Sequence, residues 1–140
     1  MSEENKALVQ RFVEEAFNKS NLDVADEVYA TGFVSHESDG PVERSPEYVK
    51  GFVGTYRGAF PDGRTTVEDS IAEGDRVAYR WTFRGTHRGE LMGIPPTDKR
   101  VTITGIIVDR ISGGKIDEEW NNFDRLGMLQ QLGVAPAPGQ

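Results

Sequence analysis

The spacing of apolar residues changes from a helical to a strand period near residue 63, and this change constrains the fold more than any other feature. Apolar residues recur every three to four positions over residues 3–18 and 46–60, with a shorter helical stretch at 22–29. From residue 65 onward they alternate with polar residues, as they do in half-buried strands. Helices followed by a run of strands favour an α+β fold.

Four segments of the second half read as strands, and a short C-terminal helix is indicated after them. The strands are expected at 65–71, 77–83, 101–111 and 115–124. We therefore expect a cone in which three N-terminal helices pack on a curved four-stranded antiparallel sheet, with an open mouth suited to a small molecule. One domain is expected over residues 1–133, followed by a disordered tail at 134–140.

Composition narrows the possible partners and locations. The chain has 140 residues, no cysteine and a formal net charge of -7, which argues against binding to nucleic acid. Without cysteine there is no disulfide, thiolate metal site or Cys nucleophile. Long apolar runs and the features of a secretion signal are also absent, so we expect a cytoplasmic protein that does not bind a membrane.

The segment 115–124 carries an unusual mixture of residues at alternating positions. A regular strand would place five of them on one face: Ile116, Glu118, Trp120, Asn122 and Asp124. Buried carboxylates are costly unless they are paired, hydrogen-bonded or protonated. We therefore interpret this face as the lining of a pocket.

Short motifs in a fixed order resemble those of a known family. They are FVSH at 33–36, AFPD at 59–62, EGDRVA at 73–78, WTFRGTH at 81–87, MGIPPT at 92–97, GKIDEEW at 114–120, Asp124, and QQLG at 130–133. Together they resemble the SnoaL-like polyketide cyclases of the NTF2-like superfamily, over roughly residues 5–133. The resemblance implies an NTF2-like/cystatin-like cone, usually dimeric and without metal or organic cofactor. It also implies ring closure of an aromatic polyketide by intramolecular aldol condensation.

Asp124 is the first catalytic candidate. An aldol cyclisation needs a base for a proton alpha to a carbonyl and an acid for the forming alkoxide, and one carboxyl with a raised pKa can serve as both. The resemblance implies an aspartate near the end of the last strand in this role, with Trp120 helping to provide apolar surroundings. Asp124 also directly precedes the C-terminal helical pattern, so a helix N-cap is the alternative.

His36 is the second catalytic candidate, and Arg110 is a candidate for substrate binding. His36 could bind a substrate oxygen or orient a carboxylate, or it could simply be hydrogen-bonded beside the loop at 37–41. Arg110 could polarise a substrate carbonyl or pair with Glu118. The resemblance implies a histidine in the neighbourhood of Arg110, and this chain has none there. His36 and His87 lack the spacing of metal ligands, so no metal site is expected.

These observations lead to one functional hypothesis with two alternatives. We expect a cofactor-free acid/base enzyme acting on a hydrophobic carbonyl-bearing small molecule, by intramolecular aldol cyclisation or a related isomerisation. The alternatives are a non-catalytic small-molecule binding protein and a hydrolase or dehydratase on the same fold. The substrate-binding residues are expected to be Trp120, Glu118, Asn122, Arg110, Phe33 and Tyr48. A homodimer is expected.

Overall fold

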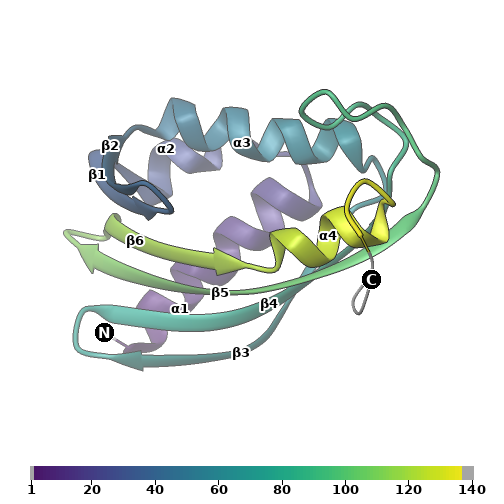
Figure 1. The fold of residues 1–140 in the computed structure, drawn as a ribbon. Helices are drawn as coiled ribbons and strands as arrows, with labels where there is room; N and C mark the ends of the chain where they lie inside the picture. Colours follow the sequence, from purple (N-terminus) through teal and green to yellow (C-terminus); the bar gives the residue numbers. More distant parts are fainter. Residues whose placement is uncertain (1, 137–140) are drawn as a thin grey trace.

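The computed structural model describes residues 2–136, which form a curved sheet with helices packed on its concave side (Figure 1). The elements, in chain order, are α1 (Ser2–Phe12), a π-helical turn η1 (Val13–Asn18), α2 (Val24–Val28), β1 (Tyr29–Glu37), β2 (Gly40–Arg44), α3 (Pro46–Ala59), β3 (Arg64–Glu73), β4 (Arg76–Thr86), β5 (Arg100–Ser112), β6 (Lys115–Phe123) and α4 (Arg125–Gln131). Of the tail expected to be disordered, residues 137–140 lie outside the described residues. None of the described helices has the length and hydrophobicity needed to span a bilayer.

The sheet has six strands in the order β2-β1-β6-β5-β4-β3, and only the β1–β6 pair is parallel. The α+β class and the three N-terminal helices are confirmed, but the expected count of four strands was wrong. The two missed strands form a hairpin whose second member, β2, contains Pro41. A short edge strand tolerates proline and lacks an apolar alternation, so it leaves little signal in the sequence.

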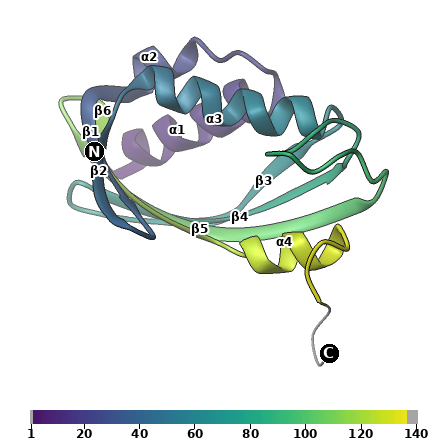
Figure 2. The same cartoon turned by 45° about the horizontal axis from the view of Figure 1, so that its top comes forward.

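The helices occupy different positions around the sheet. Helices α1 and α3 lie across the concave face, whereas α4 lies beyond the end of β6 (Figure 2). There Gln131 takes the place of a strand partner for β5. Its Oε1 accepts from the Thr102 backbone N–H at 2.7 Å, and its Nε2 donates to the Thr102 carbonyl at 2.8 Å. The free edge of β5 is thereby covered.

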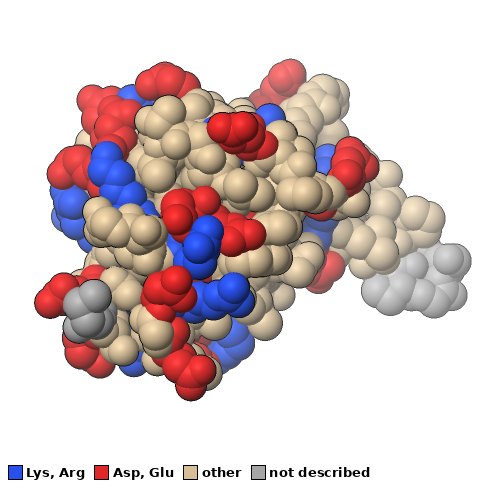
Figure 3. All heavy atoms as spheres, turned by 90° about the vertical axis from the view of Figure 1, so that its left-hand side faces the viewer, with Lys and Arg blue, Asp and Glu red and all other residues tan. Residues whose placement is uncertain are grey.

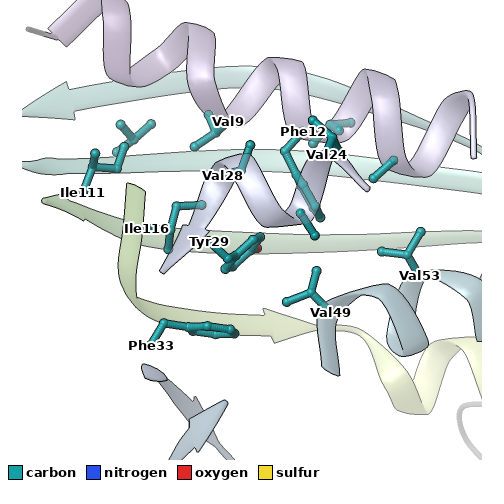
Figure 4. Close-up of a cluster of buried hydrophobic side chains, with 14 of the residues drawn as sticks. Val9, Phe12, Val24, Val28, Tyr29, Phe33, Val49, Val53, Ile111 and Ile116 are labelled. Atoms are coloured by element: carbon teal, nitrogen blue, oxygen red, sulfur yellow. The ribbon is translucent and has the colours of Figure 1, made fainter. Parts of the chain in front are cut away.

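The apolar interior is divided into two clusters. The first joins α1, α2, β1 and the beginning of α3 to the sheet, and Figure 4 shows its side chains converging from these elements. The second joins the end of α3 to β4, β5 and α4, around Phe60, Phe83 and Met128. Trp81 contacts both clusters. Several apolar side chains that pack against these clusters, including Trp81, Ile107 and Phe123, are only partly buried.

A β-bulge in β6 sets which residues face the concave side. Ile111 pairs with Ile116 and Arg110 pairs with Glu118, so Asp117 is an extra residue in β6. The Arg110 Nε lies 3.3 Å from the Asp117 carboxylate and 3.1 Å from the Glu118 carboxylate. Both acids therefore lie on the side of Arg110, away from Ile116, which is buried in the first cluster.

The bulge overturns the expected strand face. Because one residue is inserted after Ile116, the later positions on the concave side are odd-numbered: Glu119, Asn121 and Phe123. Glu118, Trp120 and Asn122 lie on the convex side instead. The expectation that these three share one face with Ile116 was wrong, because it assumed an unbroken period of two.

Candidate active site

Three rows of side chains cross the concave face of β4, β5 and β6. In register, they are Val77–Asp109–Glu119, Tyr79–Ile107–Asn121 and Trp81–Gly105–Phe123, which we call the inner rows. Their direction follows from Val77 and Tyr79, which are buried in the first cluster beneath the helices. Carboxyl and amide groups in such rows must be satisfied by neighbours or by a ligand.

The first inner row places two carboxyl groups directly opposite each other. Asp109 is 0% exposed, and its register partner Glu119 is half-buried. The Tyr29 hydroxyl donates to Glu119 Oε2 at 2.7 Å. Among residues 2–136, no conventional donor reaches either oxygen of Asp109. A proton on Asp109 accounts for two carboxyl groups lying opposite each other, because a protonated carboxyl can donate a hydrogen bond to an ionised neighbour.

The surroundings of this pair favour the protonated form of Asp109. Burial raises the pKa of Asp109 well above its ordinary value, and the charge and hydrogen bonding of Glu119 raise it further. Burial also raises the pKa of Tyr29 and of Tyr79, with the nearby carboxylates adding to the effect. The cluster therefore contains neutral phenols and a carboxylic acid that keeps its proton, next to a second carboxyl group that is partly accessible.

Apolar side chains continue the concave face beyond the acid pair. The half-buried residues that pack against one or both clusters include Phe52, Trp81, Ile107, Phe123 and Leu129. Aromatic rings of this kind bind flat hydrophobic molecules. A carboxyl pair beside an apolar surface is a suitable setting for moving protons on a hydrophobic substrate.

Asp124 lies elsewhere, at the junction of β6 and α4. Its carboxylate is exposed and accepts from the Gly127 backbone N–H at 2.8 Å, which is the N-cap interaction that was the alternative interpretation. Together with Ile106 and Asn122, and with Trp81, Gly105 and Phe123 of the third inner row, it lines a groove of about 440 Å³. The geometry thus gives Asp124 a structural role as the N-cap of α4, at the edge of a groove that it shares with the third inner row.

His36, Glu118, Trp120 and Arg110 come together on the convex side, and we call them the outer cluster. His36 Nε2 and Glu118 Oε2 are 2.6 Å apart, and the His36 ring stacks on Trp120 with centroids 4.6 Å apart. The hydrogen bond with His36, followed by the charge of Arg110, lowers the pKa of Glu118. Figure 3 shows acidic and basic side chains intermixed at the end of the molecule that carries β1 and β2. In this cluster Arg110 pairs with Glu118, which was the alternative to its role in polarising a substrate carbonyl.

The two remaining substrate-binding candidates also lie outside the inner rows. Phe33 is 2% exposed in the first cluster, where its ring contacts Tyr29 with a centroid separation of 4.8 Å. Tyr48 is 40% exposed, and the Arg44 guanidinium lies 3.9 Å from its ring centroid. Phe33 thus supports the Tyr29 side of the acid pair, while Tyr48 belongs to the surface.

The sequence-based interpretation missed Asp109, Glu119, Tyr29 and Tyr79. Asp109 left a readable signal, because it interrupts an alternating apolar series at Val101, Ile103, Ile107 and Ile111. Glu119 left none, since its direction depends on the bulge. His87 is fully buried, and its Nδ1 lies 3.0 Å from the Thr97 hydroxyl. Within residues 2–136, no three His, Asp or Glu side chains are grouped as metal ligands.

Known proteins share both the sequence pattern and this fold. Residues 7–132 match the family model of the SnoaL-like polyketide cyclases. Nogalonic acid methyl ester cyclase from Streptomyces nogalater is 31% identical over 122 residues, covering 84% of this chain and 90% of that protein. Aklanonic acid methyl ester cyclase DnrD from Streptomyces peucetius is 33% identical over 132 residues, covering 90% of this chain and 88% of that protein.

Comparison with solved structures supports the same family. AclR from Streptomyces galilaeus, for which a hydroxylase activity has been suggested, superposes with a TM-score of 0.87 at 33% identity, covering 100% of this chain and 87% of AclR. A protein from Jannaschia sp. CCS1 assigned to the SnoaL-like cyclases superposes with a TM-score of 0.84 at 25% identity, covering 96% of this chain and 95% of that protein. The chain belongs to the SnoaL-like polyketide cyclase family and adopts its NTF2-like α+β fold.

Proposed function

We propose that this protein closes a ring in a hydrophobic, carbonyl-bearing small molecule by cofactor-free acid/base catalysis, with Glu119 as the catalytic carboxylate. The observation that carries the proposal is the buried Asp109 directly opposite the partly accessible Glu119. The two cyclases from Streptomyces are named for methyl esters of nogalonic and aklanonic acid. A polyketide-derived methyl ester is accordingly the substrate class we propose here.

The proposed reaction is an intramolecular aldol addition. Glu119 removes a proton from the carbon alpha to one carbonyl, and the resulting enolate carbon attacks a second carbonyl of the same molecule. The new carbon–carbon bond leaves an alkoxide, which takes the proton back from Glu119. Atoms balance, so the product is an isomer of the substrate.

Asp109 and Tyr29 are proposed as positioning residues. Tyr29 donates to one oxygen of Glu119, and a protonated Asp109 donates from the neighbouring strand. These two contacts fix the direction of the Glu119 carboxylate while it exchanges a proton with the substrate. Because burial raises the pKa of Asp109, this donor persists well above the ordinary pKa of an aspartate.

The proposal is tested by incubating the protein with nogalonic and aklanonic acid methyl esters and analysing the products by chromatography and mass spectrometry. Ring closure gives a product of unchanged mass and altered retention. Loss of water indicates a dehydratase, gain of water a hydrolase, and gain of one oxygen atom a hydroxylase. Tight binding without any product supports the non-catalytic alternative and contradicts the proposal.

A homodimer formed through the convex faces of two sheets is also proposed. One row across this face is apolar in four strands, comprising Ile71, Ala78, Val108 and Trp120. Ile71 is 69% exposed and Ile106, beside this row, is 52% exposed. Apolar residues at this density mark association surfaces. Sedimentation velocity should show a dimer that Ile106→Arg dissociates, whereas a monomeric wild-type protein at micromolar concentration contradicts the proposal. The dimer is expected to act in the cytoplasm.

A further inference from the structure

Two pairs of arginines lie directly opposite each other on neighbouring strands, one toward each end of β4. Arg76 of β4 is the register partner of Arg110 of β5, and Arg84 of β4 is the register partner of Arg64 of β3. Register partners have Cβ atoms about 4.5–5.5 Å apart, and like charges in such positions destabilise a sheet. Each pair therefore calls for a negative charge nearby.

The first pair receives this charge from the protein itself. The row of Arg76 and Arg110 continues into β6 with Glu118, whose carboxylate lies 3.1 Å from Arg110 Nε. The Asp117 carboxylate lies 3.3 Å from the same atom. The Arg76 guanidinium lies 5.1 Å from the centroid of the Trp120 ring. Two carboxylates and an aromatic face thus stabilise these two cations.

The second pair has no comparable partners. Its row continues into β5 with the neutral residue Thr102, at the position that Glu118 occupies in the first row. Arg64 approaches Glu14 only to 3.8 Å, and both side chains are exposed. Arg84 forms no ion pair with any of residues 2–136. Two adjacent guanidinium groups therefore lack a close counterion within the described part of the chain.

A third arginine enlarges this positive surface. Arg100 precedes Thr102 by two residues in β5, so it lies on the same face and diagonally across from Arg84. Diagonal neighbours in a sheet are about 7–8 Å apart, which is within reach of long side chains. The contact of Arg100 with Asp62 is only 3.9 Å, and its side chain is 70% exposed. Three arginines thus gather on one surface of a protein whose net charge is -7.

The chemistry of this surface matches a phosphoryl group. A guanidinium group can donate two parallel hydrogen bonds to two oxygens of a phosphate, and several arginines suit a dianion. Thr102 is exposed beside the arginines, and Gln131 bonds its backbone rather than its hydroxyl. The hydroxyl is therefore available as a further donor to a phosphoryl oxygen.

We propose that Arg64, Arg84 and Arg100 bind a dianionic phosphoryl group, with the Thr102 hydroxyl as a further donor. This ligand provides the second arginine pair with the negative charge that the first pair receives from the protein. Thr102 is four residues from Ile106 along β5, a distance of about 13 Å. The site is therefore separate from the apolar row of the convex face, and it goes beyond the proposed ring closure at Glu119.

The experiment uses inorganic phosphate and phenyl phosphate as probes, with acetate as a monoanionic control. Titrations are done at constant ionic strength and at about pH 7.5, where a phosphate monoester with a second pKa of about 6 is a dianion. Calorimetry gives the affinities, and the arginine Nε–H signals of ¹⁵N-labelled protein locate the site. We expect phosphate to bind at millimolar concentration or below and to shift the Arg84 signal, with acetate at least about tenfold weaker.

The two phosphate probes distinguish the source of the phosphoryl group. Tighter binding of phenyl phosphate would assign the site to a phosphorylated organic molecule. Equal binding of the two probes would assign it to free phosphate. Both results support a phosphoryl site, and acetate binding as tight as phosphate would overturn it in favour of general attraction of anions.

Three variants compare the two arginine pairs. Arg84→Gln should weaken phosphate binding by about tenfold to a hundredfold, because it removes charge-assisted hydrogen bonds. Arg76→Gln, the matched control in the first pair, should bind phosphate as wild type does. Thr102→Glu places a carboxylate where the first row has Glu118, so it should abolish phosphate binding and raise the Tm measured without phosphate. Circular dichroism of each variant verifies that the fold is retained.

The inference is overturned if neither phosphate probe binds at millimolar concentration. It is also overturned if Arg84→Gln or Thr102→Glu binds phosphate as tightly as wild type, or if Arg76→Gln loses as much affinity as Arg84→Gln. Glu119→Gln should bind phosphate with wild-type affinity, because Glu119 is on the concave face. Phosphate binding and ring closure can therefore fail independently of each other.

Discussion

Glu118 and Glu119 are adjacent in β6, yet they are in opposite chemical environments. Glu118 faces the convex side, where His36 and Arg110 stabilise its charge and lower its pKa. Glu119 faces the concave side, where it lies opposite the buried Asp109 and receives a hydrogen bond from Tyr29. One carboxylate is paired with an arginine and hydrogen-bonded to a histidine, and the other shares its surroundings with an acid whose pKa is raised.

The contrast between these two residues shows that the face of the sheet, rather than the type of residue, decides what a carboxyl group in this strand can do. A surface acid that already has a cationic partner is stabilised in its charged form and is a weak base. A carboxyl beside a buried acid and an apolar surface can exchange a proton with a hydrophobic substrate. Substitutions on each face can test this contrast.

The largest difference is expected between Glu119→Gln and Glu118→Gln. Glu119→Gln removes the proposed base and should lower kcat/KM by about 10²–10⁴-fold. Glu118→Gln alters only the outer cluster and should leave kcat/KM within about threefold of wild type. Steady-state kinetics with the methyl ester substrates provide the measurement. Equal losses of kcat/KM in the two variants would show that a carboxyl group on the concave face contributes no more to catalysis than one on the convex face.

Asp109→Asn should change how stability depends on pH. The folded-state pKa of Asp109 is raised, so its stabilising contribution is complete below its ordinary pKa of 3.8 and is lost as pH rises toward the raised value. Over that window the free energy of unfolding should fall by up to about 1.4 kcal/mol per pH unit from this one proton. Urea titrations between about pH 4 and pH 9 should show this slope in wild type and a flatter curve in Asp109→Asn. Glu118→Gln, the matched control, should retain the slope.

The same substitution should alter the pH profile of turnover. Ionisation of Asp109 at high pH removes the donor to Glu119, so kcat of wild type should decline on the alkaline side. Asp109→Asn has no such ionisation, and its alkaline decline should be absent. A wild-type profile that is flat at high pH would count against Asp109 as a positioning residue.

Tyr29→Phe should have a smaller effect, because it removes only one hydrogen bond from Glu119. The loss of a bond of 2.7 Å to a charged acceptor should lower kcat by about tenfold, with KM little changed. Tyr48→Phe is a suitable control, since Tyr48 is exposed and lies outside the inner rows. An unchanged kcat in Tyr29→Phe would remove Tyr29 from the mechanism.

The smallest effect is expected for His36→Phe in the outer cluster. Phenylalanine can keep the stack on Trp120 but cannot bond Glu118. Partly exposed pairs of this kind contribute within about 1 kcal/mol, so the free energy of unfolding should change by less than that, with normal turnover. A large loss of turnover would instead support the catalytic role that the sequence predicted for His36.

Much of the fold was predictable from periodicity, and the part that was not has identifiable causes. Strong alternation at Val77, Tyr79 and Trp81 located β4, and the helical stripes located α1 and α3. The edge strand β2 is short and contains Pro41, so no apolar pattern revealed it. Local pattern also cannot indicate that β1 pairs in parallel with β6, because the two strands are distant in sequence.

The sequence placed the candidate site in β6, and the structure turns the residues selected there to the face opposite Ile116. The mixture of acids and aromatic residues in β6 pointed to this strand, and the alternation then selected Glu118, Trp120 and Asn122. A single extra residue, Asp117, reverses the facing of every later side chain in the strand. This bulge lets both Asp117 and Glu118 lie beside Arg110 of the neighbouring strand. A contact between strands of this kind cannot be read from a period of two within one strand.

The state of the Asp109 carboxyl is the most direct test of the contrast between the two faces. Carbon-13 NMR of the aspartate carboxyl groups, with Asp109→Asn used to assign the signal, follows this group through a pH titration. The contrast requires one aspartate that keeps its proton at pH values well above its ordinary pKa of 3.8. An Asp109 signal that titrates near 3.8 would contradict a proton held on Asp109 opposite Glu119.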